Sequence, residues 1–503
     1  MKEDKSPFFF FCLFATIFLA VFYYTATNMA GVYIVSDLGG GNHISIYTMI
    51  FYGLGNALGV PLAKPLSARF GPARTLVFCL LLYTLFTTLC SSAPTFFVLN
   101  VYRLFLGLSS GPFYIIVSAL LNAYAPPLKK SSYVSIMVTQ FAVVPVIATG
   151  IGAWMAYESH WRWIFYLNQP LSLFLAGYFW LVLRPEDPPR EKMPPFDWMG
   201  LTLYAVGVSS IVTAGAMAQQ LDWFRSHIFS TLVYIGIPAL ILFVIRELRQ
   251  ERPLLELKLL KSFTLSYALF NLAFLFSAYF GMIILIVLWL NIYVNYTPIW
   301  IAYLMGMMGL AGILAYFLCK KWMDYFDPRT PLALSILFFA ASCYYSIHFN
   351  TEIDLGRLAI ARMLSGVGLV LFLPPIFRLS IKSHGEEKSE EVFALFQVVR
   401  SVGSSLGAGL YIILWQRRQV FFHERLGEKL TRTSEITAAF FEKAIHRFHL
   451  TKEQAVAQLD VSLENQATSL ALNDAFGFML CVMIALFLLL CLTFFLKPFS
   501  LNS

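Results

Sequence analysis

Long apolar runs separated by short polar connections dominate this chain. A helix that spans a membrane needs about 20 mostly apolar residues, and Pro, Gly and charged residues mark where each run ends. An all-α protein embedded in the lipid bilayer is therefore expected. We predict fourteen spanning helices, over residues 8–35, 44–66, 74–92, 95–124, 132–156, 161–183, 198–219, 227–246, 262–293, 298–319, 330–349, 356–380, 392–415 and 471–496.

Lysine and arginine residues gather in alternate connections. The connections after even-numbered spans hold pairs such as Arg69 with Arg74 and Lys320 with Lys321, whereas those after odd-numbered spans hold almost none. Cytoplasmic loops of membrane proteins are enriched in these residues, so both termini are predicted to be cytoplasmic. The net charge of +8 is thereby assigned to membrane topology, and no binding to nucleic acid is expected.

Composition excludes several classes of protein. Hydrophobic residues make up 58% of the chain and charged residues 13%, about half the charged share of a soluble protein. The seven cysteines are dispersed and form no CxxC pair, so neither a disulfide framework nor a metal site is predicted. No GxSxG, HExxH or Walker pattern occurs, and we expect no enzyme activity, no cofactor and no ATP-driven transport.

Two connections differ from the rest. Residues 416–470 are too many for a turn and show helical periodicity, so we predict an amphipathic hairpin that covers the outer surface. The alternative for this loop is a lid or a contact site for an outer-side partner protein. Residues 184–197, rich in Pro and charge, are predicted to link two halves of the protein.

A short motif occurs twice, which indicates an internal repeat. Arg69-Phe-Gly-Pro-Ala-Arg74 recurs as Tyr325-Phe-Asp-Pro-Arg329, and an arginine inside a span follows each copy at similar spacing. Many transporters consist of two related bundles around a central site. We predict a six-helix bundle in residues 1–190, a linker with two inserted helices in 191–261, and a second six-helix bundle in 262–503. The candidate gating residues are Arg69, Gly71, Arg74, Asp324 and Arg329.

Three arginines, Arg103, Arg362 and Arg400, lie within predicted spans. An arginine at the centre of a bilayer costs about 2.5–3.5 kcal/mol on insertion scales, so it is retained where it faces protein or a water-filled cavity. For Arg103, eight residues into its span, we favour a cavity or a contact between helices. A helix-end arginine that reaches the membrane surface is the alternative for Arg362 and Arg400.

Six motifs, in order along nearly the whole chain, resemble those of the fourteen-helix multidrug-efflux branch of the major facilitator superfamily, the drug:proton antiporters. The resemblance implies a major facilitator fold, two six-helix bundles plus two inserted helices. It also implies that the protein exports hydrophobic or amphiphilic compounds by alternating access in exchange for protons. The motifs are Thr25-Ala-Thr-Asn28-Met-Ala30, His160-Trp-Arg-Trp-Ile-Phe-Tyr-Leu-Asn168-Gln-Pro170, Pro253-Leu-Leu-Glu-Leu257, Arg400-Ser-Val-Gly-Ser-Ser-Leu-Gly407, Trp415-Gln-Arg-Arg418 and Asn473-Asp-Ala-Phe476.

The resemblance also implies a substrate cavity lined by spans one, two, four and five of the first bundle and by spans nine, ten, twelve and thirteen of the second. Several arginines and no acidic residue at membrane depth predict a positive potential in that cavity, which favours anionic or neutral amphiphiles over cations. Fourteen spans without a targeting signal suit a bacterial cytoplasmic membrane. The candidate pathway residues are Tyr24, Asn28, Arg103, Gln140, Asn271, Arg362, Gln397 and Arg400.

The chain departs from the family pattern where proton coupling is concerned. Such coupling needs a titratable group at membrane depth, yet Tyr23 stands where the family has a carboxylate in the first span. Asp474 and Glu158 lie nearest the membrane and are the candidates for proton coupling. Two alternatives to an exporter remain open, an uncoupled or divergent metabolite carrier and a non-transporting membrane receptor or assembly protein.

Overall fold

A computed structural model of the chain describes residues 6–41, 44–183, 196–382, 384–385, 388–430, 435–447 and 449–494, and their regular structure is helical. The first part of the chain forms α1 (Pro7–Leu38), α2 (Tyr47–Gly59), α3 (Ala63–Phe70), α4 (Pro72–Ser91), α5 (Phe96–Tyr124), α6 (Pro127–Glu158), α7 (Trp163–Tyr166) and α8 (Asn168–Val182). Two further helices follow, α9 (Trp198–Met217) and α10 (His227–Arg249). The last part forms α11 (Phe263–Ile292), α12 (Pro298–Tyr325), α13 (Arg329–Ser346), α14 (Leu355–Lys382), α15 (Ser389–Gly427), α16 (Glu435–Glu442) and α17 (Lys452–Thr493).

The predicted spans coincide with helices, which confirms an all-α membrane protein. Eleven helices of the described residues are long and apolar enough to cross a membrane. The other three predicted spans correspond to α2 with α3, to α7 with α8, and to α13. A count of fourteen spanning helices agrees with this arrangement but stays a prediction.

Local sequence signals place several helix boundaries. The Thr95 hydroxyl accepts a hydrogen bond from the Val98 N–H and begins α5, and Thr451 with Gln454 forms a capping box at the start of α17. Gly71 lies between α3 and α4 with φ of 83°, a conformation that favours glycine. The helix ends are therefore set by ordinary capping residues.

Two sets of helices are packed in the same way. In the first set α1 packs against α6, α2 and α4 against α5, and α4 against α8; in the second, α11 packs against α15, α12 and α13 against α14, and α13 against α17. This correspondence is what a sequence repeat would produce. The domain boundaries predicted at residues 190 and 261 stay a prediction, and most of the 184–197 linker lies outside the described residues.

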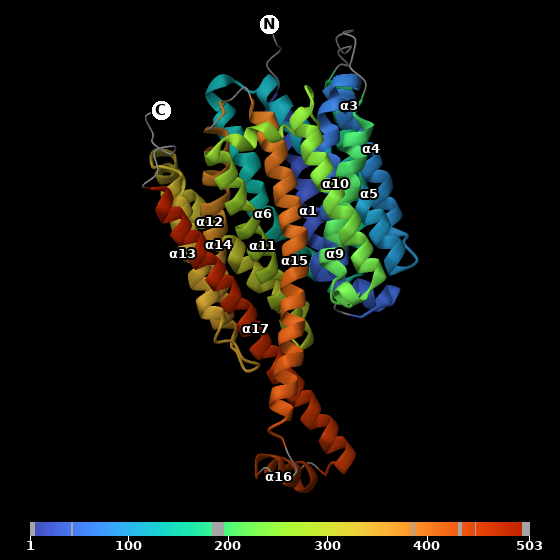
Figure 1. Cartoon of the computed structure of the whole chain (residues 1–503), viewed down its shortest axis with the longest axis vertical. Coiled ribbons are helices and arrows are strands. Elements are labelled where there is room, and N and C mark those ends of the chain that lie inside the picture. The colour runs from blue at the N-terminus through green and yellow to red at the C-terminus, as the bar shows by residue number, and fades with distance from the viewer. Residues whose placement is uncertain are drawn as a thin grey trace.

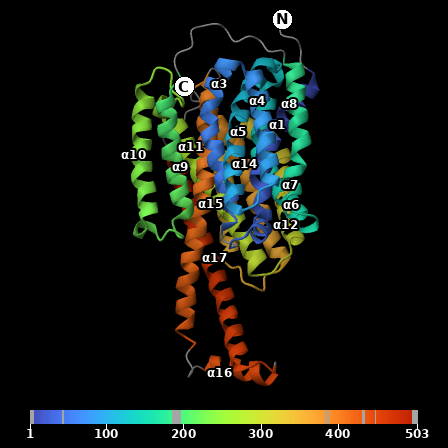
Figure 2. The ribbon, with the colours of Figure 1, turned by 90° about the vertical axis from the view of Figure 1, so that its right-hand side faces the viewer.

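The two sets meet along a seam. On it α2 packs against α15, and α6 packs against α12 and α14. Helix α9 contacts both α2 and α15, so α9 lies against both sets at the edge of the seam, with α10 packed on α9 (Figure 2). The start of α1 and the end of α17 lie at the same end of the molecule (Figure 1).

The 416–470 connection does not cover the end of the bundle as expected. Helices α15 and α17 have 39 and 42 residues, about 58 and 63 Å at 1.5 Å per residue, whereas a bilayer core is about 30 Å thick. Both continue past the other helices and form a projecting hairpin, with α16 near its tip (Figures 1 and 2). Neither 416–426 nor 452–470 contains Pro or Gly, so nothing in these stretches breaks the helices.

Glycines allow the closest helix contacts, and they give a first testable prediction. A Cβ atom on Gly107 would lie 2.1 Å from the Tyr52 carbonyl oxygen, and one on Gly366 would lie 2.1 Å from the Met308 carbonyl oxygen. Gly107→Ala and Gly366→Ala are each expected to destabilise the protein by about 1–3 kcal/mol because the backbones must separate. Thermal unfolding in detergent measures this. Gly177→Ala, with no atom within 4 Å of the new Cβ, is the matched control, and an equal loss there would contradict the explanation.

Candidate substrate site on the seam

Arg400 lies on the seam among aromatic rings from three other helices. Its guanidinium carbon is 4.5 Å from the ring centroid of Phe141 in α6, 5.4 Å from that of Tyr114 in α5 and 5.6 Å from that of Phe276 in α11. The side chain is 4% exposed. Aromatic faces attract a cation, and the attraction strengthens where water is excluded. The rings therefore hold a positive charge between the two helix sets without neutralising it.

Polar contacts of Arg400 leave its charge uncompensated. Its Nε donates to Gln397 Oε1 at 2.7 Å, while the buried Gln397 Nε2 has no hydrogen-bond partner. Within the described part of the chain, no Asp or Glu forms an ion pair with Arg400. The site thus offers a cation and an amide donor in an apolar surrounding, a combination that suits an anionic group attached to an apolar body.

Buried hydroxyl and amide groups join the two sets beside Arg400. The Tyr24 hydroxyl of α1 lies 2.5 Å from the Ser404 hydroxyl of α15. Asn56 of α2 donates to Ser110 Oγ at 3.0 Å and accepts from Ser401 Oγ at 2.9 Å. Tyr24 is among the pathway residues predicted from the sequence, whereas Asn56, Ser110, Ser401 and Ser404 are not. An asparagine in the middle of an apolar run was the available signal.

Arg103 is fully engaged in holding helices of the first set. It is 0% exposed, and it donates to the carbonyl oxygens of Tyr23 (2.8 Å) and Thr48 (3.1 Å) and to the Thr27 hydroxyl (2.7 Å). Its guanidinium carbon lies 4.6 Å from the Tyr52 ring centroid. Of the two environments favoured for Arg103, the structure shows the contact between helices.

Arg362 is equally buried but has fewer partners. Its Nη2 donates to Ser346 Oγ at 3.0 Å, whereas Nε and Nη1 have no hydrogen-bond partner. It lies within the second set, close to the Phe476 ring of α17. The two arginines of the repeat are therefore alike in burial and unlike in hydrogen bonding.

The other candidate pathway residues are dispersed over α1, α6 and α11. Asn271 is buried and donates to the Tyr267 carbonyl oxygen at 2.9 Å, with its own Oδ1 unpartnered. Gln140 is partly buried with an unpartnered Oε1, and Asn28 is partly buried. The contacts of the described residues do not join these three side chains to Arg400.

The candidate gating residues lie at the end of the molecule opposite the hairpin. Arg69 and Arg74 are exposed on either side of Gly71. Arg329 is 8% exposed, pairs with Asp327 at 2.7 Å and donates to the Thr493 carbonyl oxygen at 2.8 Å. The side chain of Asp324 lies outside the described residues. A contact that we did not foresee is the ion pair of Lys64 with Glu391, at 2.8 Å, which joins α3 to α15.

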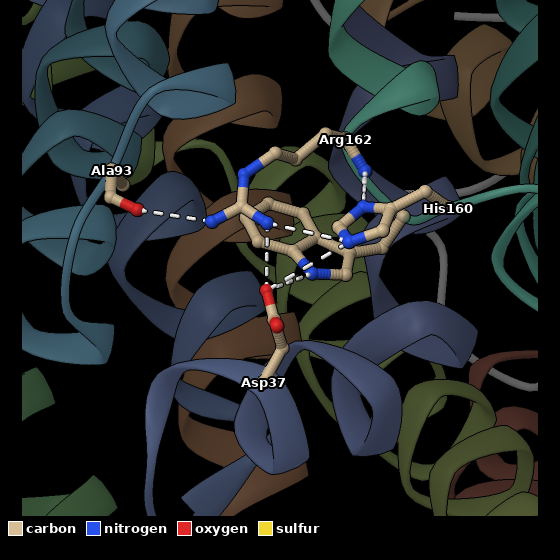
Figure 3. Close-up of polar contacts among 5 residues, drawn as sticks. Asp37, Ala93, His160 and Arg162 are labelled. Carbon is tan, nitrogen blue, oxygen red and sulfur yellow. Dashed lines mark hydrogen bonds and ion pairs between the residues drawn. The ribbon is translucent and has the colours of Figure 1, made fainter.

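A polar cluster around Asp37 fixes the end of α1 (Figure 3). Asp37 accepts from Trp161 Nε1 at 3.0 Å and from Arg162 Nη1 at 2.7 Å, and Arg162 also donates to the Ala93 carbonyl oxygen at 3.4 Å. Partial burial raises the pKa of Asp37, but the hydrogen bonds from Trp161 and Arg162 outweigh it, and the pKa is lowered overall. The motif around Trp161 therefore clamps α1 to the connection before α8.

This clamp gives a second prediction. Asp37→Asn and Arg162→Gln are each expected to lower stability, and a double-mutant cycle should show a coupling of about 0.5–1 kcal/mol, as for partly exposed pairs. Because the pKa of Asp37 is lowered, its contribution is present above the usual carboxyl pKa and is lost as pH falls through the folded value. Thermal unfolding of the four proteins at neutral and acidic pH measures both effects. Additive losses at neutral pH would contradict the pairing.

The candidates for proton coupling both lie at the end of the bundle from which the hairpin projects. Asp474 of α17 forms an ion pair with Arg418 of α15 at the base of the hairpin, and 39% of its side chain is exposed. Glu158 is exposed at the end of α6. Neither carboxylate contacts Arg400.

Comparisons with known proteins identify the family. A model of the Major Facilitator Superfamily matches residues 12–408. The chain is 25% identical over 460 residues to the multidrug export protein EmrB of Haemophilus influenzae, covering 91% of this chain and 90% of that protein. It is also 25% identical over 462 residues to the fatty acid resistance protein FarB of Neisseria gonorrhoeae, covering 92% and 90%.

Solved structures show the same fold. A bacterial homologue of the human lysosomal transporter Spinster aligns with a TM-score of 0.63 at 14% identity, covering 99% of this chain and all of that one. A peptide transporter of the POT type aligns with a TM-score of 0.62 at 18% identity, covering 96% and 93%. These structures are transporters and not enzymes. The chain is a membrane transporter that belongs to the Major Facilitator Superfamily.

Proposed function

We propose that this protein exports amphiphilic compounds whose polar end is anionic or neutral, by alternating access of a site on the seam to the two sides of a bacterial cytoplasmic membrane. The observation that carries the proposal is Arg400, a buried cation among Tyr114, Phe141 and Phe276 with no acidic partner in the described residues. A negative head group would pair with Arg400, and the rings would contact the apolar body of the compound.

The relatives support this substrate class. EmrB is named a multidrug export protein and FarB a fatty acid resistance protein, and a fatty acid is an apolar chain with one carboxylate. Helices of both sets supply the Arg400 site, α5 and α6 from the first and α11 and α15 from the second. Alternating access requires a site of this kind between two bundles. Of the other pathway candidates, we propose that Tyr24 and Gln397 line this site with Arg400. We propose Asn28, Gln140 and Asn271 for the remainder of the route.

Transport by the purified protein in liposomes tests the proposal. The substrates are three labelled amphiphiles with the same apolar chain and an anionic, neutral or cationic head group, each measured with and without an imposed proton gradient. We expect the anionic and neutral compounds to move and the cationic one to lag. Selective transport of the cation would overturn the substrate class. Transport of none of them, with competition by polar metabolites in binding, would favour a metabolite carrier.

Proton exchange is a separate part of the proposal. Accumulation driven by the gradient would establish an antiporter, and loss of that accumulation in Asp474→Asn or Glu158→Gln would identify the carboxylate responsible. Transport that ignores the gradient would indicate that Tyr23, at the position of the family carboxylate, marks a real loss of coupling.

The projecting hairpin lies apart from Arg400, and we propose that an outer-side partner protein contacts it. Replacing residues 424–458 by a short Gly-Ser linker is expected to leave transport in liposomes within about twofold of wild type, because the seam contacts of α2, α6, α12 and α14 are retained. Export from cells would fall if a partner is needed there. Loss of transport in liposomes would instead show that the hairpin is part of the transport machinery.

A further inference from the structure

One carboxylate is buried far more completely than the predicted proton carriers. Glu247, near the end of α10, is 0% exposed, and among the other acids of the described residues the side chain of Asp197 comes near it, with 5% exposed. Its Oε2 accepts a hydrogen bond from the Leu255 N–H at 3.0 Å. Its Oε1 has no hydrogen-bond partner. Glu247 is not among the predicted site residues because it lies just beyond the predicted end of its span.

The two protonation states of such a group differ in what they need. A carboxylate anion needs donors for both oxygens, and burial with one oxygen unpartnered is costly. The neutral acid can keep the bond from Leu255 to its carbonyl oxygen and buries no charge. The observed contacts therefore match the neutral acid better than the anion.

Neighbouring charges do not compensate an anion at this position. The charged groups facing Glu247 are Arg246 from α10 and Asp197 from the start of α9. Arg246 is already engaged, because its Nε and Nη2 donate to the two oxygens of Asp197 at 2.8–3.0 Å. Asp197 is itself held by the Gly200 N–H at 2.9 Å. From the connection after α10, Glu247 meets the backbone amides of Leu255 and Leu254 and no cation.

Glu247 lies where α10 meets α9 and the connector to the second set. The residue that it holds, Leu255, is buried in the 250–262 connector that leads into α11 of the second set. One turn before it, Phe243 packs against Tyr204 of α9 with ring centroids 5.1 Å apart. The Tyr204 hydroxyl donates to the Ala57 carbonyl oxygen of α2 at 2.8 Å. Contacts therefore connect the Glu247 region to α11 through the connector, and to α2 through Phe243 and Tyr204.

We propose that Glu247 is a proton-binding site. Its neutral form holds the 250–262 connector against α10, and loss of the proton makes the connector more mobile. The contacts give the direction of the pH dependence. The connector is held in place at lower pH, whereas ionisation of Glu247 as pH rises leaves a buried charge that the described partners do not satisfy. Any effect of this site on export rests on the proposed function, but proton binding and connector release do not.

Limited proteolysis of the purified full-length protein tests the inference without measuring transport. Trypsin cuts after the exposed connector residues Lys258 and Lys261. Over about pH 6 to 8, where a buried glutamic acid can titrate, we expect wild-type cleavage there to rise about tenfold beyond the intrinsic change in trypsin activity. That intrinsic change is measured on the same sites in the unfolded protein.

Two variants complete the test. Glu247→Gln, which mimics the neutral acid, should remain at the low-pH cleavage rate throughout, and an infrared carbonyl band that titrates in wild type should be missing from it. Glu251→Gln, an exposed acid on the same connector, should behave as wild type. The inference is overturned if Glu247→Gln keeps the wild-type pH dependence, or if wild type shows none. Either result leaves the liposome test of the proposed function untouched.

Discussion

Replacing Arg400 by glutamine should reduce transport of an anionic amphiphile by about 10- to 100-fold, because a charge-assisted hydrogen bond in a buried site contributes about 1.5–3 kcal/mol. The loss should be much smaller for the neutral compound with the same chain, which needs the rings of Tyr114 and Phe141 more than the charge. Initial transport rates in liposomes, over a range of substrate concentrations, measure the change.

The control for Arg400 comes from the same helix. Arg417 of α15 is exposed, donates to Gln219 at 3.1 Å and lies over the Trp223 ring, away from the seam. Arg417→Gln removes the same charge and should leave transport of both compounds near wild type. Equal losses for the anionic and neutral compounds in Arg400→Gln would mean that Arg400 supports the packing of the seam and does not recognise a head group.

Replacing Arg103 by methionine should lower stability by several kcal/mol, whereas the same change at Arg362 should be nearly neutral or stabilising. Arg103 loses three hydrogen bonds that join α5 to α1 and α2. Arg362 loses one, and the change also removes a buried guanidinium with two unpartnered nitrogens. Replacing an imperfectly paired buried charge by a well-packed apolar side chain often stabilises a protein.

Thermal unfolding of the two variants in one detergent gives this comparison. Because the arginines occupy matching positions in the repeat, each variant is the control for the other. Equal destabilisation would show that hydrogen bonding does not set their contributions. A variant that loses transport while keeping its unfolding temperature would place its arginine in the substrate pathway after all.

Much of the architecture was predictable because it depends on local pattern. Length and continuity of the apolar runs predict the helices, since a backbone in lipid must satisfy its own hydrogen bonds. The repeat of the Arg69–Arg74 motif at Tyr325–Arg329 pairs the two halves, and the two helix sets pack in the same manner. Thr451 begins α17 because its cap depends on residues within one turn.

The candidate site was predictable only in part, because contacts between distant residues decide it. The sequence placed Arg103, Arg362 and Arg400 within spans and favoured a cavity or a helix contact for Arg103, but it could not identify the residues on other helices that surround them. Only the packing of the helices shows that Arg103 joins α5 to α1 and α2, and that Arg400 faces aromatic rings of both sets. Asn56 acquires its role from Ser110 and Ser401, which are 54 and 345 residues away.

The amino-acid sequence by itself determined that this protein is built of membrane-spanning helices and carries a repeated motif, because apolar length and motif spacing are properties of the chain alone. The six family motifs, also local in the chain, indicated a transporter. Tertiary structure decided which charges are satisfied. Glu247 and Arg400 differ from other charged residues through what surrounds them, and burial with incomplete pairing is the basis on which we propose a proton-binding group and an anion-binding group. The tertiary structure likewise shows the direction of the projecting hairpin, because α15 and α17 continue unbroken beyond the bundle.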